Sequence, residues 1–149
     1  MKGIQEAQAL RLRTGTWDEL GEQALQVRLA VFVQEQKVPL EEEVDAQDPL
    51  SVHVVAYEGE RPVATGRLLA DGHIGRLAVA APWRGSGLGR RILDHLIELG
   101  WQAGHAELRL AAQCQAQLFY RKRGFVEYGE IFDDAGIPHI MMRLEKERT

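Results

Sequence analysis

The sequence predicts an α/β protein with one central mixed sheet, and three observations lead to this fold class. Segments that alternate between apolar and polar residues, as half-buried strands do, are interleaved with segments whose apolar residues recur every three or four positions, as in amphipathic helices. Strand, helix and strand patterns follow one another over residues 73–111, which is the order of a parallel crossover. A hairpin pattern precedes this crossover, so the same sheet should also contain antiparallel strands.

Each element has a local signal. The first helix has a capping residue, Thr16 or Asp18, before its apolar repeat, and it should end near Gln36 because a proline follows. The hairpin has the turn sequence Glu58-Gly59-Glu60 between two strand-like runs. The expected order is a strand over 8–13, a helix from 16 or 18 to about 36, strands over 53–57, 63–69 and 73–79, a helix from 88 to 100 or 104, a strand over 107–111, a helix over 115–123, and two strands that flank 129–138.

Length and composition exclude several classes of protein. The chain has 149 residues, so residues 1–149 are expected to form a single domain with its own core. It has no apolar stretch near the ~20 residues of a membrane helix and no signal-like start, so we expect a cytoplasmic protein without a membrane partner. Its single cysteine, Cys114, excludes a disulfide framework or thiolate metal cluster within one chain, so no metal is expected. The net charge of −4 gives no reason to expect a nucleic-acid partner.

A glycine-rich turn is the clearest functional signal. Residues 84–91 read Arg-Gly-Ser-Gly-Leu-Gly-Arg-Arg and lie between the strand that ends at Val79 and the helix that begins near Leu88. Alternate glycines let the backbone turn sharply and let a ligand approach closely. The unpaired amides and the dipole of the following helix attract an anion, and the arginines add full charges. The turn therefore predicts a pyrophosphate site, although it lacks both the third glycine of a dinucleotide fingerprint and the Gly-Lys-Ser/Thr ending of a nucleoside-triphosphate loop.

These residues resemble a known superfamily. Residues 84–89 are similar to the pyrophosphate loop Gln/Arg-x-x-Gly-x-Gly/Ala of the GNAT acyltransferases. Residues 113–125 resemble the superfamily's segment Asn-x-x-Ala-x-x-Phe-Tyr-x-x-x-Gly-Phe, with Gln113 in place of the asparagine. Residues 31–39, 43–45 and 136–142 resemble the ElaA-like branch. The resemblance implies the GNAT acyl-CoA N-acyltransferase fold, with a central mixed sheet of about six to seven strands and helices on both faces.

The resemblance also implies an activity and a set of site residues. The donor would be acetyl-CoA or another short acyl-CoA, and the acceptor a primary amine of a small molecule or peptide, with direct transfer in a ternary complex. Tyr120 matches the tyrosine that protonates the leaving thiolate in many relatives, a role that suits an ordinary tyrosine pKa of about 10. The residues implied to bind coenzyme A are Leu77, Ala78 and Val79 for the pantetheine, Arg84, Gly85, Ser86, Gly87, Leu88, Gly89 and Arg90 for the pyrophosphate, and Gln113 and Phe119 for the thiol arm.

The general base is not marked by the pattern. Many relatives carry a glutamate on the strand before the turn, where this chain has Arg76. Bases take part in acyl transfer because the attacking amine must lose its proton. The candidates for the base or the acceptor site are Glu35, His53, His139 and the pair Asp133–Asp134. We also expect the amide of Val79, or a neighbouring amide, to face the thioester carbonyl where strands 73–79 and 107–111 diverge.

Several alternatives stay open at this level. The acidic run over residues 41–48 is expected to be a solvated loop, or else a negatively charged edge that attracts a cationic acceptor. A non-catalytic acyl-CoA-binding module would keep the turn and lack working acid and base groups, and a nucleotide phosphate-binding domain is a third possibility. An edge strand near the C-terminus is compatible with a homodimer.

Overall fold

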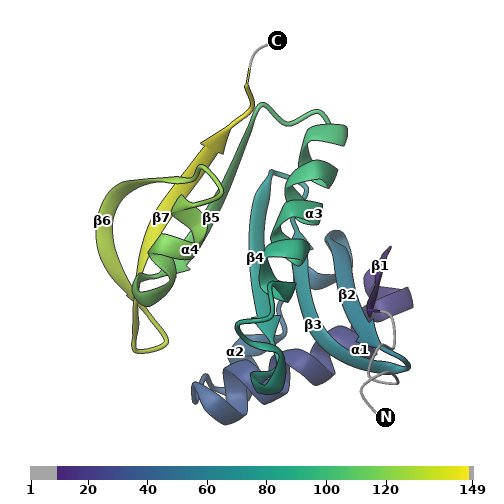
Figure 1. Ribbon diagram of the computed structural model, residues 1–149. Coiled ribbons are helices and arrows are strands. Elements are labelled where there is room, and N and C mark those ends of the chain that lie inside the picture. Colours follow the sequence, from purple (N-terminus) through teal and green to yellow (C-terminus); the bar gives the residue numbers. More distant parts are fainter. Residues whose placement is uncertain (1–9, 148–149) are drawn as a thin grey trace.

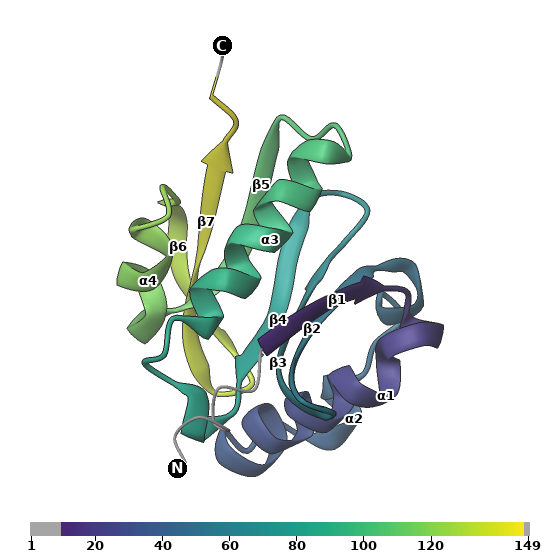
Figure 2. The ribbon, with the colours of Figure 1, turned by 45° about the vertical axis from the view of Figure 1, so that its right-hand side comes forward.

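The computed structural model describes residues 10–147, which form one seven-stranded sheet with strands in the order β1-β2-β3-β4-β5-β7-β6 (Figure 1). Helices α3 and α4 lie on one face of the sheet, while α1 and α2 lie on the other (Figure 2). The sheet is mixed and carries helices on both faces, so the predicted fold class is confirmed. The strands are β1 (Leu10–Gly15), β2 (Val52–Glu58), β3 (Arg61–Leu68), β4 (His73–Val79), β5 (Glu107–Gln113), β6 (Val126–Asp134) and β7 (Ile137–Glu145), and the helices are α1 (Trp17–Arg28), η2 (Leu29–Glu35), α2 (Leu40–Glu43), α3 (Leu88–Gln102) and α4 (Gln117–Arg121).

Helix α1 begins where its capping residues predict. The Thr16 hydroxyl accepts the backbone N–H of Glu19, and the Glu19 carboxylate accepts the backbone N–H of Thr16, which together form a capping box. The helical segment ends at Glu35, next to the predicted Gln36, but it is an α-helix only to Arg28 and a π-helix, η2, from Leu29. A π-helix has a wider turn than an α-helix, so it shifts the direction in which the apolar residues point, and such segments are frequent at functional sites.

The core lies between α3 and the sheet. Ile92, Leu93 and Leu96 of α3 are fully buried against strand residues such as Val54 and Leu108. The helix approaches β3 so closely that a Cβ on Gly66 would lie 2.7 Å from the Leu96 side chain, which would have to shift to admit a larger residue. None of the helices over residues 10–147 is both long enough and apolar enough to cross a membrane.

The sequence assignments differ from the structure at two further places. The helix expected over 115–123 is shorter, because a single 3-10 turn, Cys114–Ala116, precedes α4. Strands β6 and β7 extend into the region 129–138 and meet at a turn in which Ala135 and Gly136 both have positive φ, 55° and 81°. The signal was weak because alanine is rare in that conformation. Residues 8 and 9 of the first expected strand lie outside the described residues.

Candidate functional site

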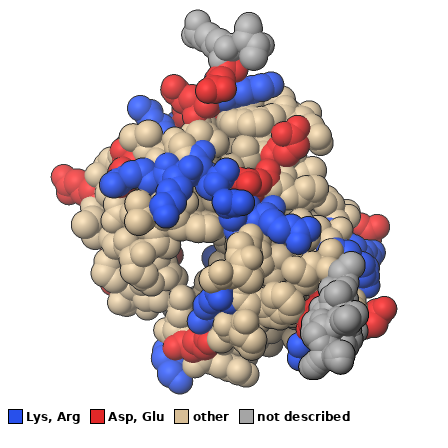
Figure 3. Space-filling model, viewed as in Figure 1, with Lys and Arg blue, Asp and Glu red and all other residues tan. Residues whose placement is uncertain are grey.

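A pocket of about 640 Å³ lies where β4 and β5 separate. These two parallel strands pair only at His73↔Arg109 and Ile74↔Leu110, and beyond that point they diverge. Residues of η2 and of the β6–β7 turn complete the walls. Figure 3 shows a hollow between the half of the molecule that carries α4 and the half that carries α3.

The backbone of β4 explains the divergence. Arg76 has a φ of 51°, a strained value for a side chain other than glycine, and the pairing of β4 with β3 shifts register between Thr65 and Arg67. Such an irregularity bends a strand away from its neighbour. The conformation is held from outside the strand, because the Arg76 guanidinium donates to the Glu43 carbonyl at 3.1 and 3.2 Å and to the Asp45 carboxylate at 3.2 Å.

The glycine-rich turn adopts the predicted strand-turn-helix position. Gly85 and Gly87 have φ values of 81° and 89°, and Gly87 is the N-cap of α3. Ser86 stabilises the turn, because its hydroxyl donates to the Trp83 carbonyl at 2.5 Å and accepts the Leu88 amide at 3.3 Å. Gly87 carries no side chain that could cap the first turn of α3, so the amides that follow Leu88 are available to an anion.

Arg84 links the turn to the pocket. Its Nε donates to the Val79 carbonyl at 3.0 Å, which occupies one of the backbone groups of β4, and its guanidinium also pairs with the carboxylate of Glu35 on η2. Both side chains line the pocket. Glu35, one of the candidate bases, is therefore tied to an arginine at the wall of the pocket.

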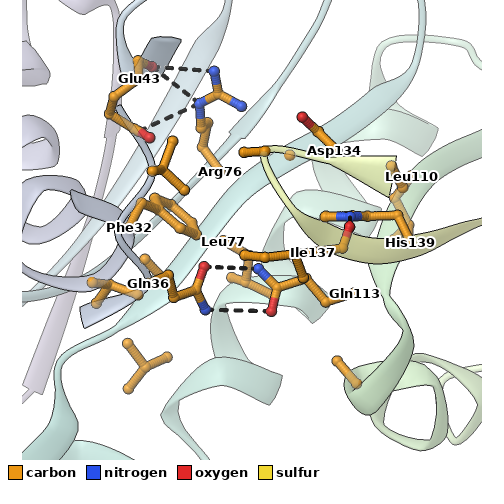
Figure 4. A pocket seen from close by; sticks show the side chains of 18 of the residues that line it. Phe32, Gln36, Glu43, Arg76, Leu77, Leu110, Gln113, Asp134, Ile137 and His139 are labelled. Atoms are coloured by element: carbon orange, nitrogen blue, oxygen red, sulfur yellow. Dashed lines mark hydrogen bonds and ion pairs between the residues drawn. The ribbon is translucent and has the colours of Figure 1, made fainter. Parts of the chain in front are cut away.

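An amide pair spans the pocket between η2 and the end of β5. Gln113 Nε2 donates to Gln36 Oε1 at 2.8 Å, and Gln36 Nε2 donates back to Gln113 Oε1 at 3.3 Å (Figure 4). Gln113 also accepts a hydrogen bond from Gln115 at 2.6 Å. Gln36 was not among the candidate site residues, although it lies within the ElaA-like segment 31–39 that could have pointed to it.

The two candidate histidines have different surroundings. His139 lines the pocket, stacks on Phe132 and has its Nδ1 2.7 Å from the Ile137 carbonyl. Because a carbonyl only accepts, Nδ1 carries the proton and Nε2 keeps a free lone pair. His53 is 1% exposed, outside the pocket, and its Nε2 lies 2.9 Å from the Asp48 carbonyl. Burial lowers the pKa of His53 below its ordinary value of 6.5, so the ring stays neutral within the core.

Tyr120 lines the pocket and packs edge-on against Phe119 and Phe125, with ring centroids 5.0 and 6.1 Å away. Burial raises its pKa to about 12, above the ordinary value assumed from the sequence. The phenol is therefore a donor throughout the neutral range. Of the residues assigned to coenzyme A, those that line the pocket are Leu77, Ala78, Val79, Arg84 and Gln113, whereas Phe119 and residues 85–90 lie outside its lining.

The acidic run is neither a solvated loop nor a free negative edge. Glu43 and Asp48 are buried, at 2% and 0% exposed, and α2 occupies residues 40–43. Their partners are arginines that are distant in sequence. Arg28 donates to Glu43 at 2.6 Å and to Asp48 at 2.9 Å, while Arg67 donates to Asp45 at 2.8 Å and to Asp48 at 2.7 Å.

The charges of this ion cluster (Arg28, Glu43, Asp45, Asp48, Arg67 and Arg76) balance. Hydrogen bonding to Arg67 lowers the pKa of Asp45 to about 2. Burial opposes the ionisation of Asp48, but Arg28 and Arg67 outweigh it and lower the pKa of that carboxyl. At Glu43 burial is the larger effect, and the pKa is raised. Among residues 10–147, no group of three or more histidine, cysteine, aspartate or glutamate side chains is arranged to hold a metal ion.

Comparisons with known proteins agree with this architecture. Residues 17–146 match the family model of the GNAT acetyltransferase domain. The uncharacterized N-acetyltransferase YjcF of Bacillus subtilis is 42% identical over 123 residues, covering 80% of this chain and 88% of that protein. ElaA of Escherichia coli is 32% identical over 132 residues, covering 81% and 84%. The crystal structure of an acyl-CoA N-acyltransferase from Pseudomonas aeruginosa has a TM-score of 0.83 and 31% identity, covering 91% of this chain and 99% of that one.

Proposed function

The chain belongs to the GNAT acetyltransferase family and is ElaA-like, and on this premise we propose that it moves an acetyl or other short acyl group from acyl-CoA to a primary amine by direct transfer in a ternary complex. The family supports acyl transfer from coenzyme A. The observation that carries the rest of the proposal is the pocket between β4 and β5, whose lining reaches the glycine-rich turn at Arg84.

The donor would bind along β4 and at the turn. Residues 85–90 combine two glycines of positive φ, amides at a helix start and the charge of Arg90, which together suit a diphosphate. Past Ile74, the edge of β4 that faces β5 pairs with no strand of the described residues, so its backbone groups can pair with the amides of a pantetheine arm. Acyl-CoA supplies a thioester, and holding it beside the acceptor would lower the barrier by several kcal/mol, about 7 in favourable cases.

Within this proposal His139 is the general base. It is the candidate histidine that lines the pocket, and its hydrogen bond to Ile137 directs the open lone pair of Nε2 away from that carbonyl. Nε2 can accept the proton that the attacking amine loses, either directly or through one water. Glu35 is paired with Arg84 and His53 is enclosed in the core, so neither side chain is as free as His139 to accept a proton from the amine.

Tyr120 acts at the leaving sulfur. Its raised pKa keeps the hydroxyl protonated, so it donates a hydrogen bond to the negative charge that develops on sulfur. A thiol has an ordinary pKa near 8.5, so Tyr120 would give up its proton only while receiving another. An acceptor that enters as an ammonium ion loses two protons, of which His139 takes the first before attack and Tyr120 receives the second as it passes its own proton to the sulfur. The phenol therefore relays a proton and does not act as a free acid.

An assay of free thiol release tests the proposal. Purified protein is mixed with acetyl-CoA and a panel of primary amines, and amine-dependent thiol release is expected, with the N-acetylated amine identified by mass. Binding of acetyl-CoA without consumption in the presence of any amine would replace the proposal with a non-catalytic acyl-CoA-binding module. Stabilisation by ATP but not by coenzyme A would instead indicate a nucleotide-binding domain.

A further inference from the structure

Three carboxylates of the described residues line the pocket, and their surroundings differ. Glu35 pairs with Arg84, and Glu43 pairs with Arg28 and Arg76. Asp134, the third, makes no side-chain hydrogen bond or ion pair with any other described residue. A negative charge at the wall of a pocket, with no internal partner, attracts a cationic group of a ligand.

The position of Asp134 is fixed by the turn between β6 and β7. Its neighbour Asp133 is used by the turn itself, because the Asp133 carboxylate accepts the Gly136 amide at 3.1 Å. Asp134 pairs in register with Ile137, at the end of the hairpin. Figure 4 shows Asp134 at the edge of the pocket across from Glu43 and Arg76.

The register also places Asp134 relative to His139. Phe132 pairs with His139 and stacks on it, and Asp134 follows Phe132 by two residues, so both side chains lie on the same face of β6. A strand advances about 3.4 Å per residue, which puts Asp134 about 7 Å along the hairpin from the Phe132–His139 pair.

From this spacing we propose that Asp134 is a specificity-determining residue that binds a second cationic group of the acceptor. The inference rests on the proposed function, in which His139 receives the reacting amine. The acceptor class is then an amine with another positive charge about 7 Å from the reacting nitrogen. An extended chain advances about 1.2 Å per bond, so 1,4-diaminobutane or 1,5-diaminopentane has the right span.

The test compares amines that differ only in the second charge. We expect 1,4-diaminobutane to have a kcat/KM about two- to fivefold above that of 1-aminobutane and above that of the shorter 1,2-diaminoethane, the effect of one ion pair near a surface. Asp134→Asn should bring the ratio of the two kcat/KM values, 1,4-diaminobutane over 1-aminobutane, down to about one. Asp133→Asn, the matched control, should leave the preference intact.

Binding separates this inference from the proposed function. Calorimetry with protein saturated with coenzyme A should show that Asp134→Asn weakens the binding of 1,4-diaminobutane by the same factor as it lowers the kcat/KM preference, whether or not turnover occurs. Asp133→Asn should leave this binding unchanged. Equal use of the mono- and diamine, or equal loss with both variants, would overturn the role of Asp134 while leaving acyl transfer standing. Diamine binding that depends on Asp134 but is not followed by thiol release would support the role of Asp134 and contradict acyl transfer.

Discussion

Replacing Gly87 by alanine separates ligand binding by the turn from the stability of the turn. Gly87 has φ 89° and ψ 0°, and a Cβ built on it meets no atom within 4 Å, so alanine would bring backbone strain without a clash. That strain costs about 1–2 kcal/mol. For a chain of this length, such a loss lowers the midpoint of thermal unfolding by about 3–6 °C.

Gly104 provides the matched control. It has φ 96°, it also has nothing within 4 Å of a built Cβ, and it lies beyond the opposite end of α3. Gly104→Ala should therefore lose similar stability. If the turn holds the pyrophosphate, only Gly87→Ala should also weaken the binding of coenzyme A, by about tenfold for the loss of one hydrogen bond to a charged group.

The two variants are compared by thermal unfolding without ligand and by calorimetric titration with coenzyme A. The reasoning fails if both variants bind coenzyme A equally well after their stability losses are matched. It fails equally if Gly87→Ala is destabilised and yet binds with the affinity of the unchanged protein.

Three further predictions concern the base, the ion cluster and acid stability. His139→Ala should lower kcat by about 10²–10⁴-fold, the usual contribution of a general base, with coenzyme A affinity unchanged in a titration; an unchanged kcat would remove the assigned role. Arg28→Met should lower the free energy of unfolding, measured in urea, by about 3–5 kcal/mol because it leaves buried carboxylates unpaired. Arg61→Ala, which breaks the exposed pair with Glu58, should lower it by only about 0–1 kcal/mol. Similar losses in both variants would mean that the cluster is not buried in solution. The pKa of Asp45 is lowered from 3.8 to about 2, so its ionised carboxylate stabilises the folded protein fully above pH 4 and loses this effect as the pH falls towards 2. Asp45→Asn should therefore flatten the acid side of the plot of unfolding free energy against pH. An unchanged acid side would contradict the pairing with Arg67.

The parts of the fold predicted from the sequence are those with local causes. Strand β4 has the predicted bounds, because alternation and the proline after it act within a few residues. The glycine-rich turn was placed correctly for the same reason, since its conformation depends on its own glycines. The end of the first helical segment near Gln36 was also predicted, but its change to a π-helix at Leu29 was not, because that change leaves the apolar repeat in the sequence intact.

The candidate site was predictable only in part, since its partners are far apart along the chain. His139 and Gln113 were both named from the sequence, but their register pairing across β5 and β7 depends on the sheet order. The reciprocal pair of Gln36 with Gln113 joins residues 77 positions apart. A tautomer fixed by a carbonyl, as at His139, has no sequence signature because the acceptor is backbone.

The acidic run shows how a charge pattern can be misread and still mark a functional feature. Replacing buried ion pairs by apolar residues is often neutral for stability, so stability alone is a weak reason for a cluster of three arginines and three carboxylates. Its geometry suggests another use. Glu43 and Asp45 hold the guanidinium of Arg76, and Arg76 is the residue whose positive φ turns β4 away from β5. A residue in that conformation persists only where its surroundings compensate for the strain. The ion cluster, with Glu43 buried and Asp45 partly exposed, therefore holds Arg76 in the conformation that separates the two strands and opens the pocket between them.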